Sequence, residues 1–111
     1  MENKERFIRA ISRYQNYNSH ICTRNKLLEK AFGSDTTIFN FDGLEELSDT
    51  IIDLSVLMFP NLSEAEIRDN IEWYLYEAVD MDNPEVIDGE NKYIVNSSEA
   101  LFLMLEQFNN E

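Results

Sequence analysis

Apolar residues recur at intervals of three and four along much of the chain, which is the period of an amphipathic α-helix. The repeat is clearest between Asp42 and Met58, where steps of 3, 4, 3 and 4 residues connect Leu44, Leu47, Ile51, Leu54 and Met58. Asp42 and Glu45 form a capping-box pattern at the start of this segment, and Pro60 ends it. The pattern therefore predicts one regular helix over this segment.

Two helical patterns precede it, from about Asn3 to Asn16 and from about Ser19 to Phe32, with Gly33 placed as a helix stop. In the first pattern, an apolar stripe lies opposite a basic face. The stripe contains Phe7, Ile11 and Tyr14, and the basic face contains Arg6, Arg9 and Arg13. We expect a short loop to follow Gly33, slightly extended at Thr37–Phe41.

The strongest local signal is a capping box at Ser63 and Glu66, in which each residue can satisfy a free backbone amide of the other. Leu62 and Ile67 flank the box with the spacing of a hydrophobic staple. This pattern predicts a helix that begins at Glu64 and frays near Asp80. Its spacing predicts that the buried residues are Ile67, Ile71, Tyr74, Leu75 and Ala78.

A β-hairpin is predicted next, because residues 85–87 and 92–95 are rich in β-formers and flank the turn sequence Asp88-Gly89-Glu90-Asn91. Asn96 and Glu99 are then expected to cap a last helix. That helix carries Leu101, Met104, Leu105 and Phe108. The predicted fold class is thus mainly α (α+β), with about five short helices on one core and a small β-hairpin between the last two.

The length of 111 residues fits a single domain over residues 1–111, and the 43% of hydrophobic residues suffices for a core. The formal net charge of −13 is unevenly distributed. Residues 1–30 contain seven Lys/Arg and three Asp/Glu, whereas residues 31–111 contain two and nineteen. The charges therefore divide the domain into a basic helical segment, residues 1–32, and an acidic helical body, residues 33–111, with the hairpin near residues 85–95.

The sequence also predicts where the protein resides. No apolar run approaches the roughly 20 residues that span a bilayer, and the N-terminus lacks the apolar stretch of a secretion signal. Cys22 is the only cysteine, as expected in a reducing compartment. We expect a cytoplasmic protein, in the cytoplasm of a host cell, that does not bind membranes directly.

Catalytic and metal sites are not predicted. His20 and Cys22 are the only histidine and cysteine, but at this spacing on a helix their side chains diverge. The acidic stretch from Asp80 to Glu90 lacks an EF-hand pattern, because Pro84 occupies a ligand position and Glu85 the glycine position. We therefore expect no enzyme activity, no cofactor and no metal.

A partner-binding surface is the feature that the sequence favours. On the helix that begins at Glu64, the face opposite the apolar stripe presents Trp73 and Tyr76 among acidic residues, and the preceding helix has an acidic face as well. An exposed Trp beside an exposed Tyr is a typical binding anchor, although the hairpin or a second subunit could instead cover both. The predicted partner-binding residues are Glu66, Asp69, Glu72, Trp73, Tyr76, Glu77, Asp80, Asp82, Glu45, Glu46, Asp49 and Asp53.

Acidic side chains one helical turn apart repeat at about 5 to 6 Å, a spacing comparable to that of phosphates along a nucleic-acid strand. A folded acidic surface can therefore imitate a polyanion. The expected partner is a protein with a basic surface, such as a nucleic-acid-binding protein or complex; nucleic acid itself is disfavoured by repulsion, and a homodimer is possible.

Three segments resemble small acidic proteins of bacteriophages and prophages of Gram-positive bacteria. They are the opening Asn3-Lys-Glu-Arg-Phe-Ile-Arg-Ala-Ile, the helix Asp69-Asn-Ile-Glu-Trp-Tyr-Leu-Tyr-Glu77 and the ending Tyr93-Ile-Val-Asn-Ser-Ser-Glu-Ala-Leu101. The resemblance implies a phage context, in which small acidic proteins include anti-CRISPR and anti-restriction inhibitors. It implies no catalytic residue.

Three functions remain open. The first is an inhibitor that blocks a basic nucleic-acid-binding defence complex, namely a CRISPR effector, restriction enzyme or nuclease, by nucleic-acid mimicry. The second is an immunity protein or antitoxin that neutralises one basic toxin. The third is a phage accessory protein that self-associates through its aromatic residues and apolar stripes.

Overall fold

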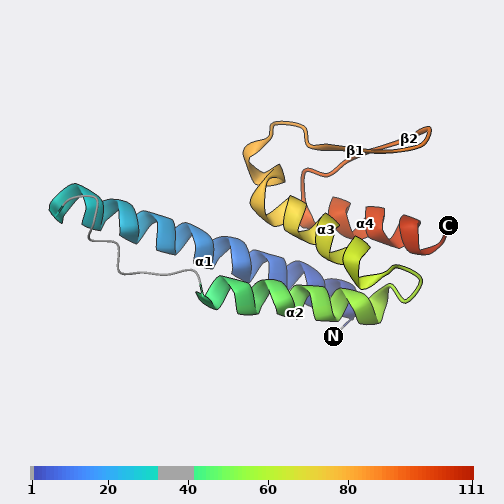
Figure 1. The fold of residues 1–111 in the computed structure, drawn as a ribbon, viewed down its shortest axis with the longest axis horizontal. Coiled ribbons are helices and arrows are strands. Elements are labelled where there is room, and N and C mark those ends of the chain that lie inside the picture. The colour runs from blue at the N-terminus through green and yellow to red at the C-terminus, as the bar shows by residue number, and fades with distance from the viewer. Residues whose placement is uncertain (1, 33–41) are drawn as a thin grey trace.

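The computed structural model describes residues 2–32 and 42–111, which form four α-helices, one short 3₁₀ helix and one β-hairpin (Figure 1). The elements follow one another as α1 (Asn3–Phe32), α2 (Asp42–Met58), α3 (Glu64–Tyr76), η1 (Ala78–Asp80), β1 (Glu85–Asp88), β2 (Asn91–Ile94) and α4 (Ser98–Asn109). The predicted fold class is thus confirmed as mainly helical with a small hairpin. The helix count of about five is wrong.

The difference lies in α1, which is one helix of 30 residues where the sequence analysis predicted two. Residues 16–19 contain no glycine or proline, and their weak helix formers cost only a few tenths of a kcal/mol each in a helix interior. A continuous helix also keeps Tyr14 and Ile21 in phase, seven residues apart, and both are buried. One continuous helix therefore buries Tyr14 from the first predicted helix and Ile21 from the second on the same face.

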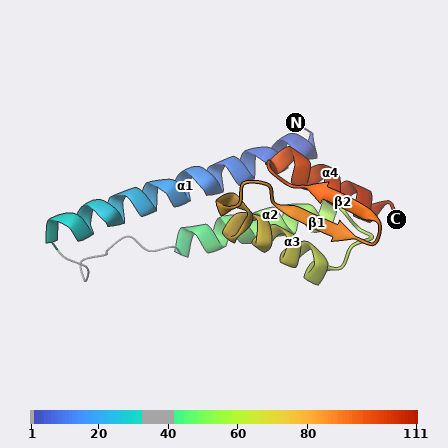
Figure 2. The same ribbon diagram turned by 90° about the horizontal axis from the view of Figure 1, so that it is seen from above.

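Helices α1 and α2 run antiparallel along the long axis, while α3 and α4 pack across one half of this pair (Figures 1 and 2). The molecule measures 53 × 29 × 24 Å, and the C-terminal part of α1 extends past the first residue of α2. Leu27, in this extension, is 63% exposed. Within the described ranges, no helix is both long enough and apolar enough to cross a membrane.

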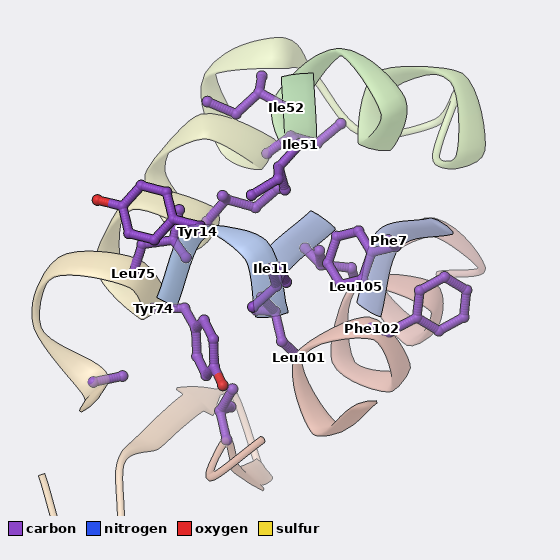
Figure 3. Close-up of a cluster of buried hydrophobic side chains, with 14 of the residues drawn as sticks. Phe7, Ile11, Tyr14, Ile51, Ile52, Tyr74, Leu75, Leu101, Phe102 and Leu105 are labelled. Atoms are coloured by element: carbon purple, nitrogen blue, oxygen red, sulfur yellow. The ribbon is translucent and has the colours of Figure 1, made fainter. Parts of the chain in front are cut away.

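Buried side chains from each of the four helices form the core (Figure 3). Phe7 and Ile11 of α1 are fully buried, and the ring of Phe7 packs edge-on against that of Phe102 in α4, with centroids 5.6 Å apart. In α2, Leu47, Leu54 and Met58 of the predicted stripe are only half-buried, so the buried sector is rotated away from that stripe. It includes Ser48 and Ser55, whose small side chains allow helices on either side to approach, and the Ser55 hydroxyl donates to the Ile51 carbonyl at 2.8 Å.

Helix α3 begins at Glu64, as predicted, and the Ser63 side chain accepts a hydrogen bond from the Glu66 amide at 3.1 Å. The Glu66 carboxylate accepts from the Ser63 hydroxyl, also at 3.1 Å, and not from the Ser63 backbone amide as the capping box predicted. The five residues predicted to be buried are all buried, four of them in α3 and Ala78 in the turn that follows. The helix ends at Tyr76 and continues as η1, so the fraying expected near Asp80 is a change to a tighter 3₁₀ turn.

The hairpin is also confirmed, but its turn is tighter than the four residues predicted. Asp88 pairs with Asn91, which leaves Gly89 and Glu90 as the loop. Gly89 has a φ of +62°, a conformation that glycine adopts without a Cβ clash. The ring of Tyr93 packs edge-on against that of Phe108 with centroids 5.3 Å apart, so the hairpin is held on α4.

The cap of α4 is Ser97, not Asn96: its hydroxyl accepts from the Ala100 amide at 3.1 Å, so the cap lies one residue later than predicted. The stop expected at Gly33 and the extended stretch at Thr37–Phe41 fall outside the described residues, and so does the side chain of Asp42 with its expected capping contact.

We expect that Asn16→Pro will lower the free energy of unfolding by about 3 kcal/mol or more, because proline removes a hydrogen bond and clashes inside a continuous helix. Asn16→Ala is the matched control, and it should keep or slightly raise stability since alanine is the better helix former. Urea denaturation followed by circular dichroism measures both. If proline were tolerated at this position, α1 would be two helices.

Candidate partner-binding surface

Helix α3 separates its side chains into a buried face and an outward face. Ile67 and Ile71 are fully buried, and this fixes the rotation of the helix. On the outward face, Glu66, Asp69 and Glu77 are exposed, as predicted. These carboxylates therefore lie on one face of a helix whose opposite side is held by the core.

The two aromatic residues of this surface have different environments. Tyr76 is 51% exposed, whereas Trp73 is half-buried and packs against the core. The Tyr76 ring lies beside the buried Tyr14 of α1, with centroids 6.3 Å apart. Tyr76 is thus an exposed aromatic group with a rigid support, while Trp73 contributes part of its surface to the core.

Arg68 joins the acidic faces of α2 and α3. Its guanidinium lies 3.5 Å from Glu64 and 3.3 Å from Glu72, one turn away on either side, and 3.6 Å from Asp49 on α2. The hydrogen bond to Glu72 is the largest cause that raises the pKa of Arg68 above its ordinary value, so the charge is fixed. One cation therefore holds together three of the carboxylates that would otherwise repel one another.

The spacing of Glu64, Arg68 and Glu72 at intervals of four residues is visible in the sequence and indicates ion pairs along one helix face. Glu64 was nevertheless missed as a member of this surface. The contribution of Asp49 was not readable, because it depends on how α2 packs against α3.

The predicted residues of α2 are spread around its exposed surface. Asp49 faces α3 through Arg68, and Glu45 lies one turn before it. Glu46 and Asp53 are exposed and lie further around the helix, toward Thr50 and away from α3. Asp80 and Asp82 are exposed beyond the end of α3. The twelve predicted residues therefore do not form one compact patch.

The acidic body has few cations to balance it. Arg68 and Lys92 are its only Lys or Arg residues, and Lys92 pairs with Glu85 across the hairpin at 2.8 Å. Lys4 of α1 also reaches the body and pairs with Glu99 of α4 at 3.1 Å. Arg6, Arg9 and Arg13 form no ion pair with the described residues. Among the described side chains of α2 and α3, most carboxylates therefore have no cation within ion-pair distance.

The residues considered for catalysis do not assemble. His20 is exposed, whereas Cys22 is half-buried with its Sγ atom 3.9 Å from the Asn18 side-chain oxygen. In the part of the chain that the structure describes, no three His, Cys, Asp or Glu side chains are grouped to hold a metal ion.

Comparison of the chain with protein-family models, with curated proteins and with solved structures finds no match. The site defines the class only as a helical protein with an acidic outward surface.

We expect stability to fall at alkaline pH through Tyr14. Burial, and then the neighbouring Tyr76 phenol, raise the pKa of Tyr14 above its ordinary value. The proton is thus held more tightly in the folded state than in the unfolded state, so stability is retained below pH of about 10 and is lost above it as the unfolded chain ionises.

Tyr14→Phe should therefore lose less stability than the wild type between neutral pH and about pH 11. Denaturant titrations at the two pH values measure this difference. Tyr17→Phe, which changes an exposed tyrosine of the same helix, is the control and should behave as the wild type. Equal alkaline losses in all three proteins would contradict the assignment.

Proposed function

We propose that this chain is a phage-type inhibitor that binds a basic nucleic-acid-binding protein complex and blocks it by occupying the surface meant for nucleic acid. The complex would be a CRISPR effector, a restriction enzyme or a nuclease. The binding surface comprises the outward face of α3, with Glu66, Asp69, Tyr76 and Glu77, and the adjoining acids of α2 around Arg68.

The observation that carries this proposal is the segregation of charge. Seven of the nine Lys/Arg residues belong to residues 1–30, while the remaining 81 residues hold nineteen of the 22 acids. The two cations of that body are already engaged by carboxylates. The resulting field attracts a basic groove over distances up to the Debye length, about 8 Å at physiological salt.

The geometry of α3 adds a reason to favour mimicry over general solubility. Glu66 and Asp69 lie about 4.5 Å apart along the axis and Glu77 follows about 12 Å further on, on a helix that the core holds rigid. A row of fixed charges loses little conformational freedom on binding. Tyr76 supplies an exposed aromatic group within the same face, which would add contact area that charge alone lacks.

The test is a tagged pull-down from a lysate of a Gram-positive bacterium, followed by a competition assay with the purified captured protein. We expect the captured protein to bind nucleic acid, and both added duplex DNA or RNA and raised salt to displace it. The captured protein should fail to bind its own nucleic acid in the presence of this chain.

Charge reversal locates the surface. Asp69→Lys with Glu77→Lys reverses two charges on the outward face of α3 and leaves the Arg68 contacts intact. The net charge of the chain changes from −13 to −9. We expect at least a tenfold loss of affinity, because attraction becomes repulsion at two positions. Glu90→Lys with Glu106→Lys is the matched control: it also gives −9, but on the hairpin turn and α4, and it should bind nearly as the wild type.

Undiminished binding by the α3 variant would remove the acidic surface from the mechanism. A captured partner that is indifferent to nucleic acid would instead favour an immunity protein that neutralises one basic toxin.

A further inference from the structure

A groove between α1 and α2 lies on the flank of α2 that faces away from α3. Arg6, Arg9, Ala10 and Arg13 line it from α1, and Leu47, Thr50 and Leu54 line it from α2; its volume is about 390 Å³. Ala10, Leu47 and Leu54 are half-buried and form an apolar floor. The sequence predicts the basic face of α1 but not this apolar floor, because the two walls of the groove come from different helices.

The two rims of the groove carry opposite charges. On the α1 side, Arg6, Arg9 and Arg13 are exposed and form no ion pair with the described residues. On the α2 side, Glu46 and Asp53 lie one turn on either side of Thr50 and are exposed. A simple polyanion would be repelled by the second rim, and a simple polycation by the first. The groove therefore favours an occupant that carries both charges beside an apolar strip.

The chain's own α1–α2 surface has this composition. We propose that the groove binds a second copy of this chain, in a two-fold dimer in which α1 of each protomer lies over α2 of its partner. A two-fold axis parallel to the helices makes the basic rim of one protomer face the acidic rim of the other, and the two apolar floors meet between them.

The spacing of the charged residues fits this arrangement. Arg6 and Arg13 are seven residues apart, and so are Glu46 and Asp53; on a helix both intervals span about 10.5 Å. Because α1 and α2 are antiparallel, Arg13 comes opposite Glu46 of the partner when Arg6 comes opposite Asp53. The axis repeats each pair, so four ion pairs form at once around the buried floor. These contacts offset the repulsion between two chains of charge −13.

The dimer leaves the outward face of α3 free, because Asp49 and Arg68 lie on the other flank of α2. This inference does not depend on the proposed function. Should both hold, each dimer presents two acidic surfaces, and binding to a partner with two basic sites gains from bivalency.

Sedimentation equilibrium over a wide range of concentration tests the proposal. We expect the wild type to have twice the chain mass of 13.1 kDa. Arg6→Glu with Arg13→Glu should be monomeric, and so should Glu46→Lys with Asp53→Lys. Lys26→Glu with Lys30→Glu is the control: like the arginine variant it takes the net charge from −13 to −17, but its positions lie outside the groove, and it should remain dimeric.

Mixing the two monomeric variants gives the decisive measurement. Every reversed rim then faces a complementary rim, so a heterodimer should form with at least a tenfold higher affinity than either variant has for itself. Circular dichroism checks that each variant folds, and Arg6→Gln with Arg13→Gln serves as a milder second variant. A monomeric wild type, a dimeric arginine variant or a mixture that stays monomeric would each overturn the proposal.

Discussion

The buried stripe of α1 is the interaction on which the rest of the fold depends. Phe7, Ile11, Tyr14 and Ile21 follow one another at steps of four, three and seven residues, and each is at most 4% exposed. Phe7 meets α4 through Phe102, and Tyr14 meets α3 through Tyr76. Because α1 contacts each of these elements along one line, its rotation sets the direction in which its arginines point. The basic rim of the groove is thus a consequence of core packing.

The same constraint separates two surfaces on α2. This helix lies between α1 and α3, so its buried sector is wide and includes two serines. Its exposed surface has α3 on one side and the α1–α2 groove on the other. Asp49 belongs to the first side through Arg68, and Leu47 and Leu54 belong to the second. A single helix therefore contributes to both proposed binding surfaces.

Repulsion among the acidic side chains is reduced by a few local ion pairs. Arg68 contacts Asp49, Glu64 and Glu72, and Lys92 contacts Glu85. Exposed pairs of this kind contribute little to stability individually. Their effect here is geometric, because they fix which carboxylates stay paired and which, such as Asp69 and Glu77, remain open to a partner.

The sequence by itself determined the local structure of this protein. The capping pattern at Ser63 marked the start of α3, Gly89 marked the hairpin turn, and the three-and-four spacing identified the buried face of α3, since these features depend on residues close together in the chain. The boundary between the first two predicted helices failed, because an in-phase stripe that packs as one unit outweighs the weak helix formers at residues 16–19. Only the tertiary structure brought Asp49 to Arg68 and left Trp73 half-buried. It also placed an apolar floor beside Arg6, Arg9 and Arg13. Each of these results from the rotation and contact of separate helices, which periodicity along one helix does not specify.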